Sequence, residues 1–409
     1  MNLGAYTLIR KIAEGGVADI YLAKTKSVGG KDAYLVCKCL RRALTQDTDF
    51  LTSAINEAQY TVRLRHPNIL EVFDLCLVQG QTFLTMEYMD AQDFHKLIRG
   101  MPEHGASSVP YPFAIYAVAQ AALGLHAAHE LTDAYGHPLN LVHRDISPEN
   151  ILFNRDGDVK IADFGIAKTS QMLDVTPPDV IKGKFNYMSP EQAWGDRPDR
   201  RSDIFSLAAV LYEATTGHAF YPAQSVADTI TRARMTLFDK PSELVPDYPS
   251  DLEAVLLKAL DIDKKLRFPT ALEFKYALDD VAKRHAWNIR RQTWIDFLRQ
   301  HVDFPDAPLP LLHADNIQLD AQSILRPLDE DPNATDQVNP DELLTILEKT
   351  AAANPAPVPR KAHKDDTDSE PAPVRTPFKP TRRGIARIVC AMVIYILIIL
   401  VCILVMVFL

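Results

Sequence analysis

The residues with the clearest chemical potential lie between positions 142 and 165, in the stretch VHRDISPENILFNRDGDVKIADFG. Asp145 is placed to accept a hydrogen bond from an attacking hydroxyl, whereas Asn150 and Asp163 supply hard oxygen ligands of the kind that Mg²⁺ prefers. Phosphoryl transfer needs such positioned groups more than it needs covalent help from the protein. The stretch therefore indicates phosphoryl transfer from a nucleotide.

The same stretch resembles the catalytic loop and the metal-binding loop of the Ser/Thr protein kinases, including their bacterial-type, eukaryotic-like members. The tripeptide His-Arg-Asp alone would carry little weight, but here Asn follows after four residues and Asp-Phe-Gly follows at hairpin distance. The resemblance covers residues 6–285, about two thirds of the chain. It implies an α+β, two-lobed protein kinase fold with a five-stranded small lobe, a mainly helical large lobe, and ATP and Mg²⁺ as cofactors.

A lysine and a glutamate in the N-terminal part match the family's phosphate-binding pair. Lys38 lies in a predicted strand at residues 34–40, and Glu57 lies in a predicted helix at residues 50–64. An isolated lysine in a strand normally faces solvent. The resemblance instead implies that Lys38 pairs with Glu57 and reaches the α- and β-phosphates.

A glycine turn at Gly15 and Gly16 interrupts the alternating pattern of residues 6–23, which predicts two strands with a turn between them. Glycine in such a turn lets the backbone approach phosphates closely. Compared with the family pattern of three glycines, Ala13 and Ala18 replace the outer two, so the turn alone is also consistent with an ordinary hairpin. The resemblance assigns four residues around this turn to nucleotide binding: Ile12, Gly15, Gly16 and Ile20.

Two further predicted strands, at residues 70–78 and 81–88, complete the small lobe and lead into a hinge. By resemblance, the backbone of Glu87 and Met89 would bind adenine, Met86 would close the back of the pocket, and Asp93 would reach the ribose.

The large lobe is expected to contain helices at residues 113–131, 207–216 and 286–302. Residues 187–191, YMSPE, resemble the motif that closes a kinase activation segment, and the resemblance pairs Glu191 with a buried Arg267. Asp203 matches the family residue that holds the backbone of the catalytic loop.

Two positions near Asp145 depart from the family pattern. Ser147 stands where most Ser/Thr kinases have a lysine, and Lys184 stands where they have a threonine. We interpret this as an exchange of an ammonium and a hydroxyl between side chains that meet beside the catalytic aspartate. The alternative is independent loss of both groups with impaired catalysis.

Composition excludes some classes of function. The net charge of −9 argues against a nucleic-acid partner, because no domain-wide excess of basic residues exists. The five cysteines show no metal-ligand spacing, and reduced thiols in a cytosol fit them better than a disulfide framework. Residues 1–10 lack the basic start and apolar run of a signal peptide.

The sequence divides into a kinase domain at 1–302 (small lobe 6–89, large lobe 90–302), a Pro- and Asp-rich linker at 303–384, and an apolar segment at 385–409. The linker composition predicts disorder. Residues 388–409 contain no charge and are long enough for a bilayer of about 30 Å. Basic residues precede this segment, which predicts a single-pass, tail-anchored protein with a cytoplasmic kinase domain, for example at a bacterial inner membrane.

Together these features predict a membrane-anchored Ser/Thr protein kinase with protein substrates and autophosphorylation, with a dimer possible through the kinase domain or the membrane segment. One rival is a pseudokinase that serves as a membrane-anchored binding platform; the degenerate glycine turn and Ser147 favour it, whereas Lys38, Asp145 and both metal ligands oppose it. Another rival is a small-molecule kinase, against which the peptide platform ending at Glu191 speaks.

Overall fold

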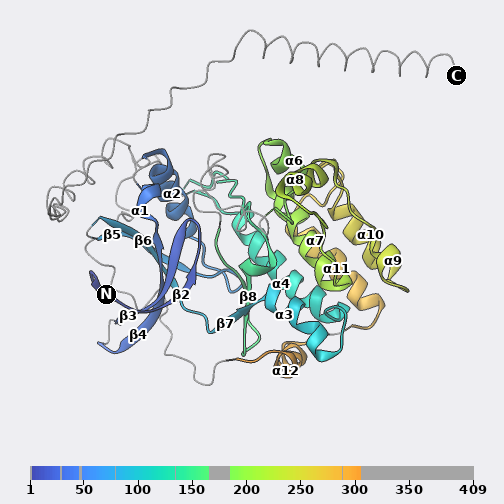
Figure 1. Cartoon of the computed structure of the whole chain (residues 1–409), viewed down its shortest axis with the longest axis horizontal. Helices are drawn as coiled ribbons and strands as arrows, with labels where there is room; N and C mark the ends of the chain where they lie inside the picture. Colours follow the sequence, from blue (N-terminus) through green and yellow to red (C-terminus); the bar gives the residue numbers. More distant parts are fainter. Residues whose placement is uncertain are drawn as a thin grey trace, which may run out of the picture. The chain divides into compact units, whose positions relative to one another are not determined.

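The computed structural model describes residues 2–27, 30–45, 48–78, 80–133, 135–164, 185–287 and 289–304. Within these ranges the chain forms a sheet-rich small lobe followed by a mainly helical large lobe (Figure 1). The two-lobed α+β prediction is confirmed. The linker beyond residue 304 and the apolar segment 385–409 lie outside the described residues, and no helix inside those ranges has the length and apolar character to cross a bilayer.

The small lobe is one antiparallel sheet with the strand order β1-β2-β3-β4-β6-β5. Its strands are β1 (Asn2–Leu3), β2 (Tyr6–Glu14), β3 (Ala18–Lys26), β4 (Asp32–Leu40), β5 (Val72–Val78) and β6 (Gln81–Glu87). The prediction of five strands was wrong by one, because Asn2 and Leu3 add an edge strand to β2 and Leu3 is buried against the sheet.

Each face of this sheet carries its own core. Helix α2 (Thr48–Thr61), which follows the short α1 (Arg42–Thr45), covers one face with buried residues such as Phe50 and Ile55. The other face buries Cys37, Cys39 and Phe83 in a second cluster. Both thiols therefore pack against apolar side chains, and burial raises the pKa of the Cys39 thiol to about 11.

The large lobe is built around two helices, α4 (Tyr111–His129) and α7 (Arg200–Thr216). Helix α4 approaches the chain that precedes β5 so closely that a Cβ on Gly124 would lie 2.5 Å from the Asn68 carbonyl oxygen. The remaining helical elements are α3 (Phe94–Gly100), η1 (Met101–His104), η2 (Pro148–Asn150), α6 (Pro190–Trp194), α8 (Val226–Met235), α9 (Pro241–Leu244), α10 (Ser250–Ala259), α11 (Ala271–Arg284) and α12 (Arg291–His301). A small sheet of β7 (Ala91–Asp93), β8 (Ile151–Asn154) and β9 (Val159–Ile161) lies in the large lobe, and a single bridge from Ile161 to Ile69 connects it to the chain before β5.

Helix α12 begins later than the sequence predicts. The expected helix at 286–302 starts only at Arg291, because Ala286 has a left-handed backbone (φ 56°) that ends the preceding structure. Trp287 therefore lies in the connecting loop, where it stacks on Tyr111, whereas Trp294 is fully buried.

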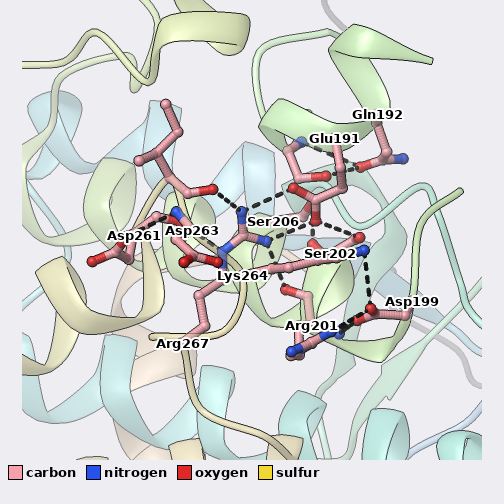
Figure 2. Close-up of polar contacts among 12 residues, drawn as sticks. Glu191, Gln192, Asp199, Arg201, Ser202, Ser206, Asp261, Asp263, Lys264 and Arg267 are labelled. Atoms are coloured by element: carbon pink, nitrogen blue, oxygen red, sulfur yellow. Dashed lines mark hydrogen bonds and ion pairs between the residues drawn. The ribbon is translucent and has the colours of Figure 1, made fainter. Parts of the chain in front are cut away.

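The ion pair predicted between Glu191 and Arg267 is present in the interior of the large lobe (Figure 2). Two parallel hydrogen bonds of 2.7 and 2.9 Å join the Arg267 guanidinium to the Glu191 carboxylate, and the Ser202 hydroxyl donates a third at 2.6 Å. Burial alone would raise the pKa of Glu191, but the Arg267 contacts outweigh it, so this pKa lies below its ordinary value. The pair thus anchors α6 to the loop before α11.

We expect Arg267→Ala to lower the free energy of unfolding by about 3–5 kcal/mol, because it leaves the Glu191 carboxylate buried without its counterion. Urea denaturation measures this change. The matched control is Arg201→Ala, whose partly exposed pair with Asp199 should contribute about 1 kcal/mol or less. Equal costs for the two arginine variants would contradict the assignment of Arg267 as the counterion of a buried carboxylate.

The same ion pair makes stability depend on pH. Because the folded pKa of Glu191 is depressed, the pair's contribution to the free energy of unfolding is complete above pH 4.5 and is lost as the pH falls through the folded value.

Candidate active site

A buried carboxylate fixes the catalytic loop. The backbone N–H groups of His143 and Arg144 each donate to Asp203 at 2.8 Å, one to each carboxylate oxygen. His129, at the end of α4, contacts the same carboxylate through Nε2 at 2.8 Å. The prediction that Asp203 holds the catalytic loop is confirmed. Asp145 follows directly, so α7 and α4 fix the backbone that leads into it, and the Asp145 N–H also lies 3.3 Å from the His143 ring within the loop.

The catalytic and metal-binding loops are joined through His143. Its ring is buried, contacts the Ala162 carbonyl through Nε2 at 3.0 Å, and packs 4.5 Å from the Phe164 ring. Arg144 and Asp163 both have left-handed backbones, with φ of 62° and 58°. Non-glycine residues hold such conformations where surrounding contacts enforce them, often at functional sites.

The β8–β9 hairpin brings Asn150 and Asp163 together. Asn150 ends η2 immediately before β8, and Asp163 stands just beyond β9. A hydrogen bond of 2.9 Å from the Ala162 N–H to the Asn150 carbonyl closes the hairpin at that end. The Asn150 amide nitrogen donates to the Asp145 carbonyl at 2.7 Å, which leaves the side-chain oxygen of Asn150 as the ligand atom for a metal.

Lys38 contacts one of these two residues, Asp163. Its ammonium lies 2.7 Å from the Asp163 carboxylate, and both side chains are partly shielded, with 14% and 32% of their surface exposed. The prediction paired Lys38 with Glu57. Glu57 does belong to α2, but its side chain is outside the described part of the structure.

The glycine turn between β2 and β3 is closed by Gly15, whose N–H donates to the Ala18 carbonyl at 3.0 Å. A Cβ on Gly15 would lie 3.2 Å from that oxygen, so the turn is tight enough to favour glycine there. Gly16 is the next residue in the same turn. Ile12 falls at a register shift of β2 and is 43% exposed, whereas Ile20 on β3 packs partly against the core beneath α2.

The hinge assignments are refined by hydrogen bonds. The Glu87 N–H donates to the Glu71 carbonyl at 2.8 Å, so only the carbonyl of Glu87 is left for an adenine. Met86 is buried and Met89 packs against the same core. Asp93 caps α3 by accepting a hydrogen bond of 2.8 Å from the Lys96 N–H, a structural role that the sequence analysis did not foresee.

Of the two exchanged positions, only Ser147 lies in the described part of the structure. Ser147 is buried at the start of η2, beside the catalytic loop. Lys184 lies outside the described residues, so its predicted meeting with Ser147 remains a prediction.

Sequence reasoning missed two basic residues near the site. Arg41, just after β4, donates to the Gly15 carbonyl at 2.9 Å and thereby ties the glycine turn to the sheet. Lys160 in β9 forms an ion pair with Glu87, with distances of 2.7 and 2.8 Å to its two oxygens. Lys160 stands between two buried residues of a three-residue strand, so its side chain is on the opposite face of the sheet from theirs. Local spacing does not reveal its partner, because Glu87 is far away in the sequence.

The described residues fit a nucleotide with a divalent metal. Lys38, Asn150 and Asp163 place one cation and two oxygen ligands in a partly exposed site. Among residues 2–164 and 185–304, with the short gaps given above, no three His, Cys, Asp or Glu side chains form a metal cluster. A metal here would complete its shell with phosphate oxygens and water, as Mg²⁺ does in nucleotide sites.

Comparisons with known proteins agree with this geometry. The chain is 41% identical over 284 residues to the tyrosine-protein kinase MasK of Myxococcus xanthus, covering 69% of this chain and 44% of the relative. It is 30% identical over 290 residues to the serine/threonine-protein kinase PrkC of Bacillus subtilis, covering 71% of this chain and 42% of the relative. The chain therefore spans less than half the length of either.

Among solved structures, the kinase domain of Mycobacterium tuberculosis PknI superposes with a TM-score of 0.54 at 26% identity, covering 69% of this chain and 98% of that domain. A profile of the protein kinase domain matches residues 6–277, which include Lys38, Asp145, Asn150, Asp163 and Asp203. The chain belongs to the protein kinase family.

Proposed function

We propose that this protein transfers the γ-phosphate of ATP, with Mg²⁺, to Ser or Thr hydroxyls of protein substrates and of itself. The observation that carries the proposal is the assembly of Lys38, Asn150 and Asp163 beside Asp145, on loops fixed by the buried Asp203. This assembly also disfavours the pseudokinase reading, because the groups that the chemistry requires are present and brought together.

Each residue has a separate task in this proposal. The Asp145 carboxylate accepts the hydrogen bond of the substrate hydroxyl and orients its oxygen for attack. Asn150 and Asp163 hold the metal, which when bound neutralises charge on the phosphates. Lys38, already within 2.7 Å of Asp163, holds the α- and β-phosphates under the glycine turn. The carbonyl of Glu87 and the backbone of Met89 hold adenine, with Ile12 and Ile20 against its faces.

The choice of hydroxyl rests on resemblance. The catalytic-loop motif and relatives such as PrkC support Ser and Thr, whereas the name of MasK refers to tyrosine. The type of residue that becomes phosphorylated therefore decides between the two specificities.

We expect the whole chain, incubated with labelled ATP, Mg²⁺ and a generic basic protein, to form phosphoserine and phosphothreonine. Lys38→Ala and Asp163→Asn should each lower the rate by at least about 10²-fold, because each removes a charge that contacts phosphate or metal. Lys26→Ala is the matched control, since that exposed lysine of the same sheet pairs only with Asp32 among the described residues. Full activity in either site variant would refute the proposed chemistry, and phosphotyrosine alone would refute the Ser/Thr assignment.

A second prediction concerns the exchange between Ser147 and Lys184. If the Lys184 ammonium replaces the missing catalytic-loop lysine, Lys184→Ala should lower kcat by about 10²- to 10³-fold with little change in nucleotide affinity. Ser147→Lys combined with Lys184→Thr should restore part of the rate, because it keeps the charge and nearly the same groups. The rates of the wild type, Ser147→Lys, Lys184→Thr and the double variant form a cycle whose coupling measures the exchange. Additive effects, or a harmless Lys184→Ala, would mean that Ser147 is an uncompensated loss.

We also propose that the kinase acts at the cytoplasmic face of a membrane, anchored through residues 385–409. The uncharged run at 388–409 and the basic residues before it support this. Dimerisation through this segment or the kinase domain stays a prediction.

Deleting residues 388–409 should move the protein from the carbonate-resistant membrane fraction to the soluble fraction while activity on soluble substrates is kept. The matched control deletes residues 329–350, a linker piece of the same length, and should stay in the membrane fraction. Membrane association that survives the first deletion would place the anchor elsewhere.

A further inference from the structure

Helix α12 lies beyond the part of the chain that matches the kinase profile, which ends at residue 277, yet it packs against the hairpin between the two metal ligands. Figure 1 shows it at the end of the large lobe near β7 and β8. We propose that Arg291 and Trp294 of α12 are positioning residues: they fix the β8–β9 turn and, through it, the spacing of Asn150 and Asp163. This inference rests on the proposed function, because it assigns those two residues to the metal.

Arg291 holds the turn by its backbone and by its charge. Its Nε donates to the Asp156 carbonyl at 3.0 Å, and its Nη2 forms an ion pair with the Asp158 carboxylate. The other oxygen of Asp158 accepts a hydrogen bond of 3.0 Å from the Asn154 side chain, across the same turn. One guanidinium thus clamps both sides of the hairpin's tip.

The approach of the helix to the turn is close enough to require glycine. Gly157 has a φ of +82°, and a Cβ there would lie 2.7 Å from Ile295 and 3.3 Å from Trp294. No side chain can stand between the turn and α12 without moving one of them. Gly157 therefore serves both the turn and the helix contact.

Trp294 fixes the helix itself. It is fully buried, with its ring 5.8 Å from Phe153 of β8 and 5.6 Å from Tyr116 of α4. One aromatic side chain thereby joins the hairpin strand to the central helix of the large lobe. Since burying an aromatic residue of this size contributes several kcal/mol, the helix is held firmly against both.

The segment after α12 reaches the chain that follows the hinge. The Asp303 carbonyl accepts a hydrogen bond of 3.3 Å from Gln92, and Phe304 packs against Phe153. Arg155, in the β8–β9 turn, lies over the Phe304 ring and also contacts Asp90 at 3.4 Å. The turn is therefore held from two sides, by α12 and by the residues that follow it.

The hairpin can transmit this restraint because it is short. Strands β8 and β9 pair at three positions, from Phe153↔Val159 near the turn to Ile151↔Ile161 beside the metal ligands. A hairpin of this size has little stability of its own. Pairing with β7 and the hydrogen bond from the Leu70 N–H to the Ile161 carbonyl hold its strands, and Arg291 holds its tip, so the position of the turn depends in part on α12. A loosened tip should alter the distance between Asn150 and Asp163, and it should lower the affinity for the metal more than the affinity for the nucleotide.

The test uses the whole chain and two measurements that do not depend on turnover. With a non-hydrolysable ATP analogue present, Mg²⁺ is titrated and the half-saturating concentration is read from the thermal shift. Arg291→Ala should raise the half-saturating Mg²⁺ concentration about 10-fold, which is the lower end of the loss seen when an outer support is removed from a metal site. The affinity for the analogue without metal should change less than twofold. Amide hydrogen exchange across residues 151–162 should accelerate in the same variant.

The matched control is Arg299→Ala on the same helix, since Arg299 is 67% exposed and contacts only Asp296 among the described residues. It should leave both measurements unchanged. Asp158→Asn removes the same ion pair from the hairpin side. In the double variant Arg291→Ala, Asp158→Asn, the change in Mg²⁺ half-saturation should be well below the sum of the two single effects, expressed as free energies.

The outcomes separate the two proposals. If Arg291→Ala matches Arg299→Ala in Mg²⁺ half-saturation, or if it lowers only the melting temperature, α12 merely stabilises the fold and the inference is refuted. If the wild-type protein transfers no phosphate, the proposed function fails, whereas the Mg²⁺ titration and the hydrogen exchange still decide whether Arg291 positions the metal ligands.

Discussion

The active site depends on one buried carboxylate, that of Asp203 in the first turn of α7. It accepts hydrogen bonds from two successive backbone N–H groups of the catalytic loop and contacts the His129 ring. A buried acceptor in such a position is costly unless every lone pair is used, and here the loop itself supplies the donors. The conformation of the loop is therefore coupled to the interior of the large lobe, where α7 is buried along nearly its whole length.

That coupling explains why the strained backbone is tolerated. Arg144 follows the first held amide and adopts a left-handed conformation, which costs of order 1–3 kcal/mol and persists only where neighbours enforce it. The two hydrogen bonds to Asp203 and the packing of His143 on Phe164 provide that enforcement. The loop thus holds Asp145 in place without help from a substrate.

Much of this arrangement could be predicted from the sequence, because motif spacing and apolar periodicity are local. The resemblance of the motifs to protein kinases implied that Asp145, Asn150 and Asp163 share one site. The alternating pattern of residues 6–23 predicted the strands beside the glycine turn, and the β-rich run at 34–40 predicted the strand that carries Lys38. The edge strand β1 was missed because two residues carry no periodicity. The start of α12 was misplaced because a left-handed residue at Ala286, which apolar spacing does not reveal, ends the previous structure.

Charged partners that no family motif links were not predicted, because they are brought together only in three dimensions. Lys38 contacts Asp163, a partner that was not predicted, while its predicted pair with Glu57 stays a prediction because the Glu57 side chain lies outside the described residues. Glu87 was expected to act through its backbone and also pairs with Lys160. No spacing rule joins Glu87 to Lys160, which lie on different sheets. Only the packing of the lobes brings them together.

Both of these ion pairs join the small lobe to one short stretch, residues 160–163. Lys38 extends from β4 to Asp163, and Glu87 extends from β6 to Lys160, while the Leu70 N–H donates to the Ile161 carbonyl between them. The two pairs differ in exposure: the Glu87–Lys160 side chains are 14% and 16% exposed, whereas Asp163 is 32% exposed. The more shielded pair is the costlier to break, because separating it leaves a desolvated charge. In the other pair Lys38 is 14% exposed, but the Asp163 carboxylate is open to water, so a phosphate and its metal can replace that contact at lower cost. One ion pair between the lobes is thus shielded on both sides, whereas the other is open at Asp163, where the proposed nucleotide and its metal would bind.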